Sequence, residues 1–244
     1  MSTFSESAAT ALQLVLSLDP VLLSIVGRSL SVSALACVFA CTLGVALGAW
    51  LGVARFAGRG VVLTLLNTAL AVPAVVVGLV VYLLLSRSGP LGHLGWLFQF
   101  EAMVLAQTLL VLPLATALAR QLIEDAESRH GEQLQSLGAG AGLRSLLLAW
   151  DERYALLTLL ITAFGRAISE VGTVMIVGGN IDGYTRVMTT AIALETSKGD
   201  LPLALALGLV LLAVVLLLNT GIALLRRWRE REEARGRAPA EATA

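Results

Sequence analysis

Residues 154–178 read YALLTLLITAFGRAISEVGTVMIVG, an apolar run long enough to cross a bilayer that carries an arginine and a glutamate near its centre. The preceding residues 132–144, EQLQSLGAGAGLR, are polar and rich in glycine. A charge deep in a membrane helix costs about 2.5–3.5 kcal/mol on insertion scales, so it is seldom kept without a structural or functional reason. A water-exposed segment joined to a polar membrane helix is typical of a transport protein.

The composition is that of an integral membrane protein. Hydrophobic residues make up 57% of the 244 residues and charged residues only 14%, against roughly 25% in a soluble domain. Aromatic residues are 5%, which favours packed helices over the aromatic-girdled strands of a membrane barrel. The net charge is zero, and no basic region with interleaved aromatics supports binding to nucleic acid.

Five apolar stretches are long enough, at about 20 residues each, to cross a hydrocarbon core of about 30 Å. They lie at 29–54, 61–85, 101–120, 154–178 and 202–225. A sixth stretch, 8–26, is interrupted at Asp19 and Pro20, and proline is best accommodated at a helix start. We therefore expect a short N-terminal peripheral helix, followed by a helix that opens at Pro20 and leads into the first span.

The predicted fold class is all-α: a polytopic membrane helix bundle with five transmembrane helices plus the N-terminal peripheral helix. It forms one domain over residues 1–225, with a cytoplasmic segment at about 121–153 that contains two short helices separated by glycines. Residues 226–244 form a tail that we expect to be disordered at its end. Pro73 and Pro113 lie inside the second and third spans, where each favours a kink.

Basic residues predict which side of the membrane each loop occupies. Five spans place the termini on opposite sides, and one side holds twelve arginines, six of them within 226–237. The other side holds Arg28, Arg87, Arg186 and Lys198. Because cytoplasmic loops carry the excess of basic residues, we expect the N-terminus outside and the C-terminus inside. The absence of a positive charge before Arg28 argues against a cleavable signal peptide.

Local motifs argue against a metal, cofactor or nucleotide site on this chain. Cys37 and Cys41 are too close for a useful disulfide and too few for a metal site, so we interpret them as packing residues. The glycines at 138–142 are followed by no lysine, which a phosphate-binding loop requires. A dinucleotide fingerprint fails at Leu143, where the third glycine belongs. Any nucleotide must therefore be hydrolysed by another subunit.

The segment 132–151 resembles the cytoplasmic loop of ABC importer permeases of the binding-protein-dependent, MetI-like type. That signature is Glu-Ala-Ala, three residues, Gly, nine residues and Ile-x-Leu-Pro. Here Glu132 is followed by Gly138 after six residues and by Leu148 after ten more. The match is partial, because Gln-Leu replaces the two alanines and Trp150-Asp151 stands where Leu-Pro is usual.

A second block resembles the sulfate, molybdate and tungstate permeases of the same kind. It is GRAISEVGTVMIVGGNIDGYT at 165–185, and its continuation TTAIALETSKGD at 189–200 is most similar to the tungstate branch. The resemblance covers nearly the whole chain. It implies the type I ABC importer permease fold and import of an oxyanion by alternating access, with tungstate as first choice and molybdate or sulfate as alternatives.

The resemblance also implies partners and a location. These are a second copy of the chain in a homodimer, two copies of an ABC ATPase that binds ATP, and a periplasmic or lipid-anchored oxyanion-binding protein. The location is the plasma membrane of a bacterium or archaeon. The loop is expected to form the helix that couples to the ATPase, through Glu132, Leu137, Gly138, Ala139, Gly140 and Leu143. An ordinary solvated loop is the alternative.

Five polar residues of the fourth span fall on one face of a continuous helix: Thr162, Arg166, Ser169, Glu170 and Thr173. A polar stripe in a membrane helix faces protein or a water-filled path, so these are the pore-lining candidates. Arg166 and Glu170 have two interpretations. Either they form an i,i+4 pair that neutralises both charges, or Arg166 donates to a passing tetrahedral oxyanion while Glu170 prevents tight binding.

The span is predicted to end at Gly178-Gly179-Asn180, and residues 185–197 then form a short outer helix. Gly179, Asn180 and Thr185 are candidates for an external gate or for the surface that docks the binding protein, the alternative being a plain extracellular loop. Two other classes of function stay open. A self-contained channel or ion-coupled carrier needs no ATPase, and an intramembrane enzyme lacks support because no span carries a nucleophile with a base.

Overall fold

The computed structural model describes residues 4–241, all of them in helices or in the connections between helices. The first half contains α1 (Phe4–Leu16), α2 (Pro20–Val53), α3 (Arg59–Ala71), α4 (Ala74–Leu85) and the short 3₁₀ helix η1 (Gly92–Leu94). The second half contains α5 (Phe100–Ser136), α6 (Ala141–Asp151), α7 (Arg153–Ile168), α8 (Gly172–Gly178), α9 (Met188–Lys198) and α10 (Leu201–Glu241). The predicted all-α class is confirmed, and a separate first helix precedes α2 as predicted.

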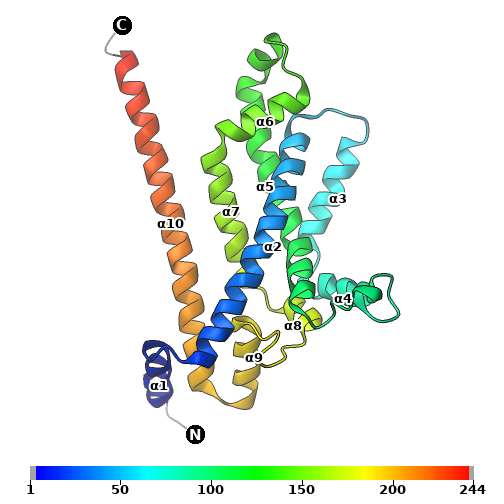
Figure 1. Ribbon diagram of the computed structural model, residues 1–244. Helices are drawn as coiled ribbons and strands as arrows, with labels where there is room; N and C mark the ends of the chain where they lie inside the picture. The colour runs from blue at the N-terminus through cyan, green and yellow to red at the C-terminus, as the bar shows by residue number, and fades with distance from the viewer. Residues whose placement is uncertain (1–3, 242–244) are drawn as a thin grey trace.

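The helices define two ends of the bundle (Figure 1). The α6 end holds α6, the α2–α3 connection and the C-terminal part of α10. The α9 end holds α1, α9 and the α8–α9 connection. The segment around 121–153 and the C-terminal region therefore share one end, while the N-terminal region lies at the other.

Asp19 and Pro20 start α2 as predicted. The Asp19 Oδ1 accepts hydrogen bonds from the backbone N–H groups of Val21 (2.9 Å) and Leu22 (3.0 Å), which would otherwise lack a partner at the helix start. Pro20 has no N–H to satisfy and occupies the first helical position. The break between α1 and α2 is therefore encoded in two adjacent residues.

The central contact of the bundle is between α2 and α5, and glycines allow it. A Cβ placed on Gly48 would lie 2.5 Å from the Thr116 carbonyl oxygen and 2.7 Å from the Ala119 Cβ. At Gly44 and Gly52, one turn away on either side, a Cβ would lie 2.7 Å from the Ala115 Cβ and 3.0 Å from the Ile123 Cβ of α5. Small residues at four-residue spacing let membrane helices approach closely and pack by van der Waals contact. Cys37 and Cys41 are buried in the same core, which confirms that they are packing residues.

Among the residues that the structure describes, three helices are long and apolar enough to cross a membrane alone: α2, α5 and the part of α10 from Leu201 to Leu225. Two further crossings are bent pairs, α3 with α4 at 99° and α7 with α8 at 59°. If each pair crosses once, the five predicted spans are present. The break at 61–85 lies where Pro73 predicts a kink, whereas the continuous helix expected through 162–173 is wrong, because α7 and α8 are separate helices.

Proline explains the first break. Val72 is extended, with φ −64° and ψ 127°, as expected for the residue before a proline. Pro73 then caps α4, which turns across the end of α3 (Figure 1). Pro113, in contrast, lies inside α5 without breaking it. Of the two predicted kinks, the one at Pro73 is a sharp bend.

The last helix, α10, continues through the predicted tail as far as Glu241. Residues 242–244 lie outside the described residues. One helix thus runs through the 225/226 boundary drawn from composition, and the disorder expected at the end of the tail stays a prediction.

Candidate functional site

The break between α7 and α8 is built around Glu170. The Glu170 N–H donates to the Ala167 carbonyl oxygen at 3.1 Å, which closes a tight turn after α7. Its carboxylate then accepts from the Thr173 N–H at 3.2 Å and is 3.4 Å from the Thr173 Oγ1. An anionic acceptor at a helix start satisfies free N–H groups and interacts favourably with the helix dipole. Glu170 therefore starts α8 at the point where α7 ends.

Arg166 and Glu170 form an ion pair. The Arg166 Nη1 lies 2.6 Å from the Glu170 Oε2, and the exposed fractions of the two side chains are 45% and 5%. The pairing interpretation is confirmed. Glu170 is surrounded by donors of its own chain, whereas the guanidinium of Arg166 is partly open to the surface.

The five predicted stripe residues do not share one face, because the helix breaks between them. Thr162, Arg166 and Ser169 are exposed on α7, while Glu170 and Thr173 are buried. The prediction of a continuous polar face on one helix is wrong for this reason. The Thr162 and Ser169 hydroxyls donate to carbonyl oxygens of their own helix at 2.9 Å.

Thr173 joins the two bent pairs to each other. Its side chain is fully buried, and its Oγ1 donates to the carbonyl oxygen of Ala74, the first residue of α4, at 2.9 Å. A Cβ on Gly78 would lie 3.0 Å from the Thr173 Cα, so α4 and α8 are in backbone contact there. We call α4, α8 and this contact the bend junction. A movement of one bent helix must displace the other.

The α8–α9 connection has the backbone geometry that its sequence predicts. Gly178 ends α8, and Gly179 and Asn180 adopt left-handed conformations with φ of 69° and 52°, which glycine and asparagine tolerate best. The Asn180 Nδ2 donates to the Thr190 carbonyl oxygen at 3.3 Å. Thr185 is buried; its Oγ1 donates to the Gly178 carbonyl oxygen and accepts from the Ile181 N–H. The three predicted gate residues therefore belong to one ordered turn.

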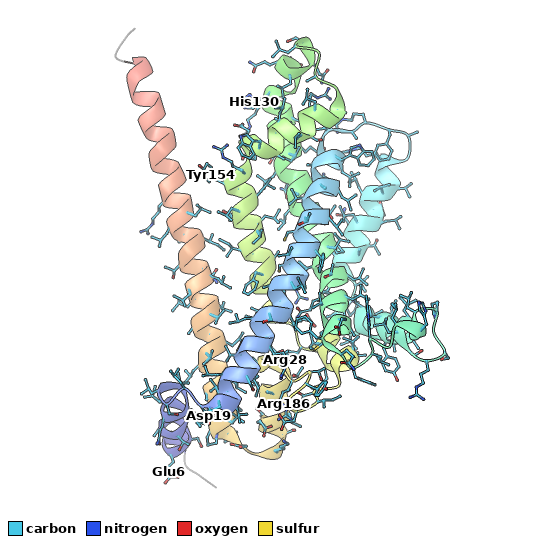
Figure 2. All side chains as sticks on the ribbon, viewed as in Figure 1. Glu6, Asp19, Arg28, His130, Tyr154 and Arg186 are labelled. Carbon is cyan, nitrogen blue, oxygen red and sulfur yellow. The ribbon has the colours of Figure 1, made fainter. Side chains whose placement is uncertain are left out.

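Three residues that sequence reasoning missed fasten this turn to the bundle. Arg28 on α2 donates to the carbonyl oxygens of Gly183 (2.6 Å) and Arg186 (3.3 Å), and Figure 2 shows Arg28 and Arg186 close together at the α9 end. The Ser29 Oγ accepts from the Met188 N–H at 2.7 Å. The Thr189 Oγ1 donates to the Glu170 carbonyl oxygen at 2.7 Å, so α9 is tied to the α7–α8 break.

At the α6 end, the predicted coupling segment is a helical hairpin. Its first arm is the end of α5 rather than a separate short helix, so the prediction of two short helices is wrong for that arm. The turn contains Gly138 with φ +81°, and the Ala139 N–H donates to the Leu134 carbonyl oxygen at 3.0 Å, a common way for a helix to end at a left-handed glycine. The second arm is α6.

The tip of the hairpin exposes apolar side chains. Leu137 has an exposed fraction of 83% and Leu143 of 52%. Of the predicted coupling residues, Ala139 is half-buried, while Glu132, Gly138, Gly140 and Leu143 are exposed. An apolar patch beside polar residues is typical of a protein interaction surface.

Ion pairs hold the two arms of the hairpin together. Arg144 on α6 lies 3.0 Å from the Glu127 carboxylate on α5, with both side chains largely buried, and also donates to the Ala139 carbonyl oxygen at 3.1 Å. Arg129 on α5 pairs with buried Glu152 at 2.8 Å. A tip fixed by buried charge pairs presents its exposed side chains in one arrangement.

Within the described part of the chain, no three histidine, cysteine or acidic side chains gather as metal ligands would. The charged groups described above are instead paired within the chain, apart from the open side of Arg166. The arrangement provides hydrogen-bond donors and ion pairs beside a bent helix pair.

Comparison with known proteins gives clear relatives. The chain is 41% identical over 206 residues to a tungstate uptake system permease protein of Peptoclostridium acidaminophilum, covering 84% of this chain and 90% of that protein. It is 42% identical over 190 residues to a probable anion ABC transporter permease protein of Haloferax volcanii, covering 76% and 82%. A molybdenum transport system permease protein of Escherichia coli is 30% identical over 184 residues, covering 67% and 75%. No family model matches the chain.

Proposed function

This chain belongs to the family of ABC importer permeases that includes the tungstate uptake permeases, and from that premise we propose that it is the membrane subunit through which tungstate enters the cell. One observation carries this proposal: 41% identity that extends over 90% of a tungstate uptake permease. Molybdate is the second candidate, favoured by the 30% identity to a molybdenum permease. The chain is a permease subunit and not an enzyme.

The exposed hairpin tip supports coupling to a separate ATPase. We assign the contact to Glu132, Leu137, Gly138, Ala139, Gly140 and Leu143, because they lie on or beside a turn that projects from the α6 end with its apolar side chains uncovered. ATP binds and is hydrolysed on that partner. The proposed assembly contains two copies of this chain, two ATPases and one oxyanion-binding protein.

The oxyanion path is assigned to the exposed face of α7. Thr162, Arg166 and Ser169 lie on that face. The two hydroxyls can donate to an anion only by giving up their hydrogen bonds to carbonyl oxygens of their own helix, so that contact is weak. Arg166 attracts the anion, while its pairing with Glu170 limits how tightly the anion is held. A path must release what it admits, so weak contacts suit it better than a high-affinity site.

The α8–α9 turn is assigned to the external gate. Gly179, Asn180 and Thr185 shape the turn, Thr189 ties it to the α7–α8 break, and Thr173 ties that break to α4. Glu170 and Thr173 act in this proposal as buried parts of the gate rather than as pore-lining residues. The binding protein docks on the same outer surface.

The proposed orientation places the α6 end in the cytoplasm and the α9 end outside. Arg55, Arg59, Arg120, Arg129, Arg144 and Arg153 lie in the segments that form the α6 end. Basic loops favour the cytoplasmic side. The N-terminus is then outside and the C-terminus inside, in the plasma membrane of a bacterium or archaeon.

The test is uptake of tungstate by proteoliposomes that contain this chain, its ATPase and its binding protein. We expect tungsten to accumulate, as measured by mass spectrometry of the vesicle contents, only when all three proteins are present and ATP is supplied on the side of the ATPase. Molybdate uptake that exceeds tungstate uptake at equal concentration would favour the second candidate. Flux through vesicles that contain this chain alone would instead establish the channel or ion-coupled carrier.

A further inference from the structure

A groove of about 850 Å³ lies between α2, α6 and α7, on a part of the surface that the proposed oxyanion path does not use. Its volume falls within the roughly 300–1,000 Å³ of ordinary ligand sites. Val38, Val45 and Ala49 of α2 form one wall and Leu157 and Leu160 of α7 the other. Among the residues that line it, Arg153 is the only charged one. The groove is therefore apolar along its length with a cation at one end.

The groove has the length of one leaflet of a bilayer. From Val38 to Ala49, α2 rises about 17 Å at about 1.5 Å per residue, close to half of the roughly 30 Å hydrocarbon core. Arg153 and α6 close the groove at the α6 end, where α7 begins. The cation thus lies where the headgroups of that leaflet would lie, and the apolar walls lie where its acyl chains would lie.

The surroundings of Arg153 are those of an interfacial cation. Its guanidinium lies over the rings of Trp150, at 5.4 Å from the centroid, and Tyr154, at 4.7 Å, and Nη1 donates to the Trp150 carbonyl oxygen at 2.9 Å. Figure 2 shows Tyr154 at the α6 end of α7. Tryptophan and tyrosine concentrate at membrane–water boundaries. Among the side chains that the structure describes, no carboxylate forms an ion pair with Arg153.

We propose that this groove binds an anionic phospholipid of the leaflet beside α6, with its phosphate on Arg153 and an acyl chain between α2 and α7. Charge favours a lipid over the helix of a second copy. The membrane helices α2, α3, α4 and α7 all expose apolar side chains and contain no aspartate or glutamate. Such a helix would fill the groove and leave Arg153 without an anion, whereas a phosphate forms charge-assisted hydrogen bonds with a guanidinium.

The experiment is a lipid titration of the purified full-length chain, with phosphatidylglycerol and phosphatidylcholine as probes and native mass spectrometry as the measurement. The wild type is expected to bind phosphatidylglycerol more tightly than phosphatidylcholine. Arg153→Ala is expected to weaken phosphatidylglycerol binding about fivefold, the equivalent of about 1 kcal/mol for one basic residue near a membrane surface, and to leave phosphatidylcholine unchanged. That unchanged binding also shows that the variant is folded.

Two further variants locate the site. Ala149→Trp fills the groove from α6 and is expected to weaken both lipids, while Arg227→Ala removes an exposed arginine outside the groove and is expected to weaken neither. Equal binding of the two lipids by the wild type, or an unchanged preference in Arg153→Ala, would overturn the proposal. So would a photo-crosslinker at Val45 that captures a second copy of the chain instead of lipid.

Discussion

Replacing Gly138 with tryptophan separates the role of the hairpin tip in coupling from its role in folding. The φ of Gly138 is +81°, and a Cβ built there meets no atom within 4 Å. The cost to this chain is therefore backbone strain alone, about 1–2 kcal/mol for a left-handed residue with a side chain, against a typical stability of about 5–15 kcal/mol. The subunit should fold, while the indole projects beside exposed Leu137, where the proposed ATPase contact lies.

The effect on the partner should be larger than the effect on the fold. Disturbing a central interface residue typically costs about 2 kcal/mol or more, which weakens association roughly thirtyfold. The assay measures ATP hydrolysis and tungstate uptake in the same proteoliposomes. We expect Gly138→Trp to remain inserted and to lose most uptake per ATP hydrolysed.

Two glycines serve as matched controls. Gly140 has φ −68° and also has no atom within 4 Å of a built Cβ, so Gly140→Trp adds bulk to the tip without strain and should uncouple as well. Gly58, in the α2–α3 connection, has φ +89° and the same open space. Gly58→Trp therefore introduces the same backbone strain at a position away from the tip, and this variant should transport normally. Undiminished uptake by Gly138→Trp would refute the coupling assignment. Loss of uptake in all three variants would show that any bulky substitution disturbs the protein, wherever it lies.

Four further substitutions test the parts of the fold that position the proposed gate. Gly48→Leu should force α2 away from the α5 backbone and cost about 1–3 kcal/mol; a melting temperature equal to that of the wild type in detergent would contradict the close packing. Arg166→Ala should cost about 3 kcal/mol because it leaves the buried Glu170 carboxylate without its ion-pair partner, whereas Glu170→Ala should cost about 1–2 kcal/mol, for the lost acceptor at the start of α8, because the arginine that it leaves is partly exposed; thermal unfolding in which Glu170→Ala is the more damaging would reverse this assignment. Arg28→Ala should leave melting nearly unchanged but speed hydrogen exchange across 179–187 several-fold, since it removes two hydrogen bonds to that turn; unaltered exchange there would show that Arg28 does not fasten the turn.

Local chemistry in the sequence was sufficient to predict the helical class, the start of α2 and the end of α8. Each depends on neighbouring residues: Asp19 with Pro20 for the first boundary, Gly179 with Asn180 for the second. The Arg166–Glu170 pair was predictable for the same reason, because residues four apart on a helix are neighbours.

The breaks inside two spans were not predictable from apolar length alone. At Pro73 the sequence carries a signal, yet Pro113 carries the same signal and leaves α5 continuous. At Glu170 the helix breaks because its carboxylate accepts from the Thr173 N–H at the start of α8. The Thr189 hydroxyl of α9 donates to the Glu170 carbonyl oxygen, and the Thr173 hydroxyl donates to the Ala74 carbonyl oxygen of α4. The contacts of Arg28 with residues 155 and 158 positions away were beyond local reasoning.

The continuity of α5 connects the two regions that the proposal assigns to coupling and gating. At its α9 end, Met103 packs against Gly178, where a Cβ would meet the sulfur at 2.8 Å, and the Gln107 Nε2 donates to the Ala167 carbonyl oxygen at 3.0 Å. At the other end, the same helix leads into the Gly138 turn. A helix of 37 residues is about 55 Å long at about 1.5 Å per residue. A force applied at the turn therefore reaches the α7–α8 break through one hydrogen-bonded helix, and the packing of α5 against both sides of that break determines how the bend junction responds.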